Sequence, residues 1–136
     1  MLRRRSTQPD PLRRQNVVLF GLEGHRFALP ARDIVEVARI ESYTPLPCED
    51  PAHLGVVLHR EHVIPLVDVG PRLGLRRPRP AVRPRLCVFV RAAAGELGLP
   101  VDEVLGFRHG PGEAPREEVL LDPDGLGGSY GQGTAH

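Results

Sequence analysis

Apolar residues along this chain occur in short runs separated by glycine, proline and charged residues. Runs of about four to eight β-branched and aliphatic residues with such boundaries are typical of β-strands. The pattern predicts three hairpins, with strands at residues 17–22 and 26–30, 54–59 and 62–69, and 85–91 and 96–100. Their turns are expected at residues 23–25, 60–61 and 92–95. The first strand is apolar on both faces, which favours a barrel or a sandwich over an open sheet with one solvent-exposed face.

The remaining apolar residues predict a few more short elements. Residues 31–34 fit a helical turn that leads into a strand ending at Ile40. Further short strands are expected at residues 101–107 and 119–121, whereas the three prolines of residues 41–51 indicate a loop. About seven short strands with turn signals between them predict an all-β fold.

Length and composition bound the domain organisation. A chain of 136 residues forms one compact domain or two very small subdomains that share a core. Gly and Pro number 15 each, which argues against long helices. We expect one domain at residues 17–126, between a flexible Arg-rich tail at 1–16 and a flexible Gly-rich tail at 127–136.

The apolar runs also bear on the compartment. The longest of them hold about five residues, compared with the roughly 20 that a membrane-spanning helix needs. No apolar segment follows the N-terminal arginines, as a secretory signal would require. We therefore expect a cytoplasmic protein that does not insert into a membrane.

The charge is nearly balanced overall but uneven along the chain. All 18 basic residues are arginines, against 17 acidic residues, and the net charge is +1. Residues 71–95 hold seven arginines and no acid, so one alternative is a small Arg-rich nucleic-acid-binding β-barrel. Aromatic residues make up only 4% of the chain, and prolines interrupt the basic run. Few bases could stack on such a surface, so we expect a solvated linker at residues 76–84 and no nucleic-acid partner.

Candidate chemistry is sparse. His59 and His62 lie near each other, but residues three apart along a strand point to opposite faces, and no third ligand is close in sequence. Cys87 stands in an apolar run and is expected to be a buried hydrophobic residue, while Cys48 lies in a proline-rich loop. No nucleophile or phosphate-binding motif is present. We expect no catalytic residues, no metal and no cofactor.

Six short blocks follow one another in a set order and spacing. They are Phe20 with residues 27–30 (FALP), 35–37 (VEV), 44–47 (TPLP), 55–60 (GVVLHR), 63–69 (VIPLVDV) and 98–106 (GLPVDEVLG). This order resembles the CheW-like family, the coupling domains of bacterial chemosensory systems, from residue 17 to about residue 126. The resemblance implies two small intertwined five-stranded SH3-like barrels with a shared aliphatic core and no enzymatic activity.

The resemblance also implies partners. Proteins of this kind bind the regulatory domain of the histidine kinase CheA and the cytoplasmic tip of a methyl-accepting chemoreceptor, at membrane-associated receptor arrays. Glu36 matches the acidic residue of the family's Val-x-Glu-Val block, and Arg60 matches the arginine of its Asn-Leu-Arg-Gly turn. Both are associated with partner contact. The complete set of expected partner-binding residues is Glu36, Leu58, Arg60, Val101 and Val104.

The sequence departs from the family pattern in two places. Leu58 and Glu61 stand where the family turn has asparagine and glycine. The stretch at residues 109–118 is shorter than in relatives, so we expect the second barrel to lack a strand. Two hypotheses follow from the resemblance: an adaptor that couples receptors to CheA, or a shortened accessory or inhibitory scaffold that binds only one partner.

Overall fold

The computed structural model describes residues 16–47, 49–75, 85–109 and 118–126. The expected Gly-rich tail, the expected linker and nearly all of the Arg-rich tail lie outside these residues, as do Cys48 and most of the loop at 109–118. The described residues form two β-sheets with short helical turns between them. No helix in these ranges is long and apolar enough to cross a membrane.

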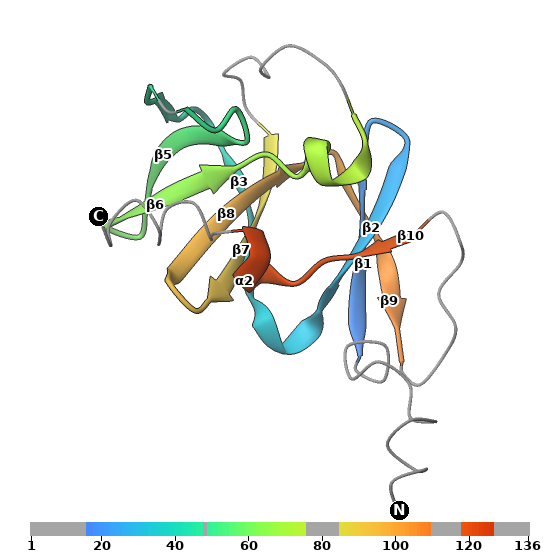
Figure 1. The fold of residues 1–136 in the computed structure, drawn as a ribbon. Coiled ribbons are helices and arrows are strands. Elements are labelled where there is room, and N and C mark those ends of the chain that lie inside the picture. The colour runs from blue at the N-terminus through green and yellow to red at the C-terminus, as the bar shows by residue number, and fades with distance from the viewer. Residues whose placement is uncertain (1–15, 48, 76–84, 110–117, 127–136) are drawn as a thin grey trace, which may run out of the picture.

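Both ends of the described chain contribute to the smaller sheet, which has four strands in the order β10-β2-β1-β9 (Figure 1). These strands are β1 (Val17–Leu22), β2 (His25–Pro30), β9 (Glu103–Arg108) and β10 (Glu118–Leu120). β1 pairs antiparallel with β2 and β9, whereas β10 joins β2 in parallel. Among the described residues this sheet is one strand short of the five that the resemblance implied.

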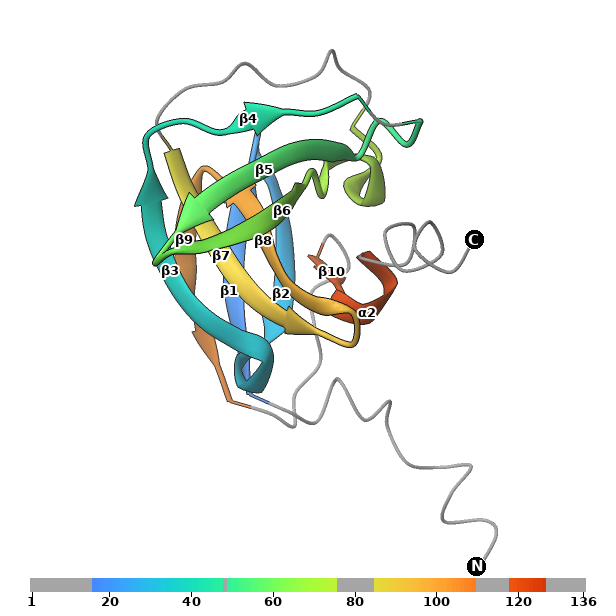
Figure 2. The same ribbon diagram turned by 90° about the vertical axis from the view of Figure 1, so that its left-hand side faces the viewer.

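The middle of the chain forms a six-stranded sheet in the order β3-β7-β8-β6-β5-β4 (Figure 2). Its strands are β3 (Ile34–Ile40), β4 (Thr44–Pro45), β5 (His53–His59), β6 (His62–Val67), β7 (Arg85–Ala92) and β8 (Gly95–Val101). The 3-10 turns η2 (Ala31–Asp33) and η3 (Gly70–Leu73) lead into β3 and follow β6, and the helix α2 (Pro123–Leu126) ends the described chain.

The predicted all-β class and the three predicted hairpins are confirmed. They are β1–β2, β5–β6 and β7–β8, each closed by a two-residue turn. The helical turn before β3 is also confirmed, as a 3-10 turn. The loop predicted at 41–51 differs, because Thr44 and Pro45 form the short strand β4 against β5. That pairing depends on Gly55, since a Cβ there would lie 2.1 Å from the Thr44 carbonyl oxygen.

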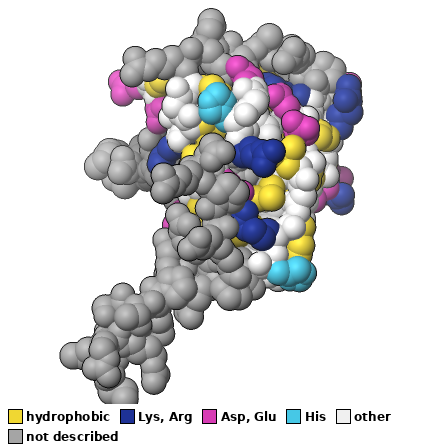
Figure 3. Space-filling model, turned by 90° about the vertical axis from the view of Figure 1, so that its right-hand side faces the viewer, with side chains coloured by type: hydrophobic (Ala, Val, Ile, Leu, Met, Phe, Trp, Pro, Cys, Tyr) yellow, Lys and Arg dark blue, Asp and Glu magenta, His cyan; other side chains and the backbone are white. Residues whose placement is uncertain are grey.

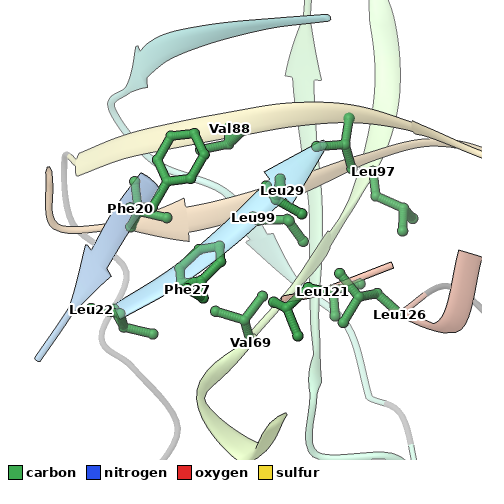
Figure 4. Close-up of a cluster of buried hydrophobic side chains, with 13 residues drawn as sticks. Phe20, Leu22, Phe27, Leu29, Val69, Val88, Leu97, Leu99, Leu121 and Leu126 are labelled. Carbon is green, nitrogen blue, oxygen red and sulfur yellow. The ribbon is translucent and has the colours of Figure 1, made fainter. Parts of the chain in front are cut away.

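Aliphatic side chains and three phenylalanines fill the core, as the low aromatic content requires. One cluster lies between the two sheets and includes Phe20 and Phe27, whose stacked rings have centroids 5.5 Å apart. In Figure 4, Leu121 and Leu126 from the C-terminal segment reach this cluster beside Val69. A second cluster lies within the six-stranded sheet. The two sheets therefore share the first cluster, and the six-stranded sheet encloses the second by itself.

In the six-stranded sheet, β6 and β8 are joined by a single registered pair, Leu66 with Gly98. A Cβ at residue 98 would lie 2.6 Å from Leu66 Cδ2 and 3.0 Å from the Cys87 sulfur. A side chain at residue 98 would displace these buried side chains, so glycine suits the packing at this position. Towards His62 and Gly95 the strands diverge around a hollow of about 360 Å³.

His53 is a buried imidazole, 2% exposed, at the start of β5. Burial lowers the pKa of His53, and Asp50, whose carboxylate lies 3.9 Å away, only partly offsets this effect. A lowered folded-state pKa means that the unfolded chain takes up the proton first as the pH falls below the usual value of 6.5.

We therefore expect the urea midpoint of unfolding to fall between about pH 7.5 and about pH 5.5. In a His53→Gln variant this decrease should be smaller, because glutamine does not titrate. An equally steep decrease in the variant would show that other groups cause the pH dependence.

Candidate functional site

Three polar side chains meet where β3 approaches the tip of the β5–β6 hairpin. Glu36 Oε1 lies 2.9 Å from His59 Nε2 and 2.7 Å from Arg60 Nε. The second carboxylate oxygen, Oε2, accepts a hydrogen bond from Arg60 Nη2 at 3.0 Å. Figure 2 shows β3 running past the tip of this hairpin. We call these three residues the Glu36 cluster.

The Glu36 cluster joins parts of the sheet that share no strand ladder. β3 lies at one edge of the six-stranded sheet, whereas β5 lies next to β4 at the other edge. The sheet therefore curls until the two sides meet, and the bidentate Arg60–Glu36 contact bridges the gap. Such paired contacts fix orientation better than a single hydrogen bond does.

The turn that carries Arg60 is strained. Arg60 and Glu61 have φ angles of 51° and 69°, in the left-handed region that favours glycine. These angles are those of the two-residue turn that best fits the twist of a hairpin. Arg60 and Glu61 therefore adopt this turn although neither is glycine.

Contacts in the Glu36 cluster keep the Glu36 carboxylate charged and hold the His59 ring in place. Hydrogen bonds from His59 and then Arg60 lower the pKa of Glu36 below its usual value of 4.5. The His59 ring stacks on the buried ring of Phe89, with centroids 4.2 Å apart and planes 7° from parallel. Arg60 keeps most of its side chain in solvent, with 73% exposed, so it can also contact a partner.

Exposed apolar residues stand next to the residues of this charged cluster along the same strands. Leu58 and Val63 are directly paired across the β5–β6 hairpin and are 72% and 67% exposed. Val35 and Val37, which flank Glu36 on β3, are partly exposed as well. We call Glu36, Leu58, Arg60 and Val63 the hairpin surface. Apolar area beside a few charges is the composition of a protein-binding patch.

The structure brings together three of the five residues expected to bind partners. Glu36, Leu58 and Arg60 lie at the hairpin surface, whereas Val104 lies on β9 in the other sheet and is 45% exposed. Val101 is fully buried in the core between the sheets. The structure therefore corrects the expectation for Val101, because its side chain has no surface with which to touch a partner.

Sequence reasoning missed His59 and Val63. His59 was considered only as a metal ligand, and its contact with Glu36 depends on the curling of the sheet. His59 and His62 form a directly opposed pair across the hairpin, so they share a face. The expectation that they point to opposite faces is wrong, because they lie on two strands and not on one. In the part of the chain that the structure describes, no three side chains form a group that could hold a metal.

The buried cysteine is unsuited to nucleophilic chemistry. Cys87 is fully buried in β7, and burial raises the pKa of its thiol to about 12. The thiolate is the nucleophilic form, and it is scarce at neutral pH for such a group.

Comparison with known proteins agrees with this geometry. A family model described as "CheW-like domain" matches residues 16–128. The protein FrzA of Myxococcus xanthus is 33% identical over 114 residues, which are 84% of this chain and 67% of FrzA. The crystal structure of the scaffolding protein TtCheW from Thermoanaerobacter tengcongensis superposes with a TM-score of 0.60 at 24% identity. This match covers 71% of the chain but only 65% of TtCheW, so it supports the fold alone.

The match to the family model includes every strand and turn described above, from β1 to α2. The chain therefore belongs to the CheW-like family.

Proposed function

We propose that this protein is a non-catalytic adaptor that couples methyl-accepting chemoreceptors to the histidine kinase CheA. The observation that carries the proposal is the hairpin surface, where an exposed apolar pair lies on the hairpin that carries His59 and Arg60 of the Glu36 cluster. This role places the protein in the cytoplasm, at receptor arrays. Its partners are the regulatory domain of CheA and the cytoplasmic tip of a receptor.

The hairpin surface has the properties that reversible protein binding needs. Leu58 and Val63 supply apolar area that gains free energy when it leaves water. Arg60 supplies an exposed guanidinium, the cation most enriched at protein interfaces. Its contact with Glu36 orients the guanidinium before a partner arrives, which lowers the entropy lost on binding.

A Leu58→Asp substitution is expected to weaken binding of a partner by at least about tenfold, because a carboxylate replaces an apolar contact. Arg60→Glu should have a similar effect, since it reverses the charge at the exposed side of the cluster. Isothermal titration calorimetry with the regulatory domain of CheA, and separately with a receptor-tip fragment, measures both changes. The melting temperature of Leu58→Asp should stay close to the wild-type value, because Leu58 is largely in solvent.

The matched control is Leu46→Asp, which places the same charge at another exposed leucine of the same sheet region, beyond β4. It should leave binding unchanged. If wild-type protein binds neither fragment at tens of micromolar, the coupling role is wrong. If it binds and Leu58→Asp binds equally well, the role stands but the hairpin surface is not where binding occurs.

One observation favours the alternative of an accessory scaffold. The turn at the hairpin surface carries Leu58 and Glu61 in place of the family's asparagine and glycine, so its partner contacts differ from those of its relatives. A scaffold of this kind binds the kinase without activating it. Reconstituted arrays of receptor, CheA and this protein decide the matter: stimulated autophosphorylation excludes the accessory role, and binding without stimulation supports it.

A further inference from the structure

A hollow of about 360 Å³ lies between β6 and β8. Among the described residues these strands share only the registered pair Leu66 and Gly98, so no ladder fills the space beside it. Figure 2 looks onto the β5–β6 hairpin and the β7–β8 turn, whose residues line the hollow. Figure 3 shows the opposite side of the molecule, where the described hydrophobic side chains lie between arginines. The apolar lining of the hollow is separate from those side chains.

Small residues on the β8 side leave this space open. Ala94 and Gly95 form that end of the wall, and a Cβ placed at Gly95 would meet no atom within 4 Å. Ile64 and Leu97, each 3% exposed, are the buried members of the lining, whereas Val63 is 67% exposed. Val63 therefore keeps apolar surface in water beside an open space, and a side chain that fills the space gains free energy by covering it.

The lining of the hollow combines apolar and polar groups. His62 and Glu96 contribute to it together with the aliphatic residues. Its volume is at the lower end of the range for binding pockets, so it suits one side chain better than a helix. An aromatic ring with a hydroxyl group matches this composition, because the ring packs on the aliphatic residues and the hydroxyl meets a polar group at the rim. Tyrosine is the side chain of this kind.

The described chain ends beside the hollow. The amide of Ala93 donates a hydrogen bond of 2.6 Å to Asp124 Oδ1, which fastens α2 to the β7–β8 turn. Leu126, the last residue of α2, is buried in the same cluster as Leu97. Figures 1 and 2 both show α2 next to this turn. The chain therefore leaves α2 close to Ala94, which follows Ala93 and lines the hollow.

Residues 127–136, which follow α2, read GGSYGQGTAH. Tyr130 is the only Phe, Trp or Tyr outside the described ranges. It stands four residues after Leu126, a reach of up to about 14 Å for an extended chain. The segment has no proline, and glycines on both sides of the tyrosine allow the backbone to turn. Among the segments outside the described ranges, this one has both the side chain and the attachment point that the hollow requires.

We propose that the segment 127–136 folds back onto the six-stranded sheet and that Tyr130 inserts its ring into the hollow between β6 and β8. The ring packs against Val63 and Leu97, and its hydroxyl meets the polar rim. The hollow is thus a binding site for a tyrosine side chain of the same molecule. This inference goes beyond the coupling role, and neither depends on the other.

Acrylamide quenching of tyrosine fluorescence tests whether the ring is docked. The chain has two tyrosines and no tryptophan, so Tyr43→Phe leaves Tyr130 as the only emitter. In the folded Tyr43→Phe chain, the quenching constant should be at least about threefold lower than in the same chain unfolded in urea, because the docked ring is shielded in most molecules. Equal constants in the folded and unfolded chain overturn the proposal.

Two exposed positions on the β5–β6 hairpin test where the ring binds. In the Tyr43→Phe background, Val63→Asp places a carboxylate in the lining of the hollow and should raise the quenching constant towards that of the unfolded chain. Leu58→Asp is the matched control, because Leu58 pairs with Val63 across the hairpin but does not line the hollow. It should leave the constant unchanged. A constant that Val63→Asp does not alter, or that both variants raise equally, overturns the proposal.

Nuclear magnetic resonance of the wild-type chain tests the contacts without any substitution. Docking predicts nuclear Overhauser effects from the ring protons of Tyr130 to methyl groups of Val63, Ile64 and Leu97. If the ring shows no such effects, the hollow is not its site and the proposal is wrong. If the effects appear only as the protein concentration rises, the ring belongs to a second copy, and docking within one molecule is overturned.

Discussion

Replacing Val67 with aspartate is expected to leave the chain unfolded at room temperature. Val67 is 1% exposed and packs in the cluster between the two sheets, close to the point where β6 meets β8. The substitution removes an apolar side chain from that cluster and introduces a carboxylate among buried apolar side chains. Together these changes cost more than about 5 kcal/mol, comparable to the whole stability of a small domain.

The matched control lies on the same strand. Val63→Asp introduces the same charge at a residue that is 67% exposed, and it should change the free energy of unfolding by less than about 1 kcal/mol. Near-ultraviolet circular dichroism and urea titration measure both variants. A cooperative Val67→Asp transition close to the wild-type midpoint would show that the core between the sheets tolerates a charge and that its packing differs from the structure.

Val63 and Val67 also show how far the sequence predicts this fold. Hairpins are local, and a run of aliphatic residues on each side of a turn was enough to place β1–β2, β5–β6 and β7–β8. The sequence does not say which valine of β6 is buried, because both stand in apolar surroundings. That depends on how β6 meets β8, a strand about thirty residues away along the chain.

The same reasoning explains the partner-binding residues. Glu36 and Arg60 were expected from the family resemblance, but nothing local indicates that they touch, since 24 residues separate them. Val101 was misplaced because β8 is buried on both faces over its last five residues, so alternation does not distinguish inward from outward positions. His59 was missed because its partner Glu36 and its stacking partner Phe89 come from other strands.

In each sheet an ion pair bridges two sides that no strand ladder connects. The pair is Arg60 with Glu36 in the six-stranded sheet and Arg108 with Glu118 in the four-stranded sheet. Arg108 ends β9 and Glu118 begins β10, so the pair links the two edges of that sheet. The two pairs differ in burial: the Glu36 side chain is 24% exposed and the Glu118 side chain only 2%. The buried pair should therefore have the larger effect on stability.

An Arg108→Met substitution is expected to destabilise the protein by about 3 to 5 kcal/mol. Arg108 donates two hydrogen bonds to Glu118, from Nη1 to Oε1 at 2.9 Å and from Nη2 to Oε2. Glu118 in turn raises the pKa of Arg108, chiefly through these hydrogen bonds. Methionine fills much of the same volume but leaves the Glu118 carboxylate buried without its cation, and an unpaired buried charge is far costlier than a missing pair.

The double variant Arg108→Met/Glu118→Leu distinguishes the effect of losing the ion pair from the effect of leaving a buried carboxylate without its cation. Because it removes both charged groups together, it should recover most of the stability that Arg108→Met loses. Urea titration of the wild type, the two single variants and the double variant gives the coupling energy between the two sites. If the double variant is as unstable as Arg108→Met, the ion pair itself joins the two edges of the four-stranded sheet. Recovery would instead mean that packing joins them and that the arginine serves to neutralise a carboxylate that the fold has buried.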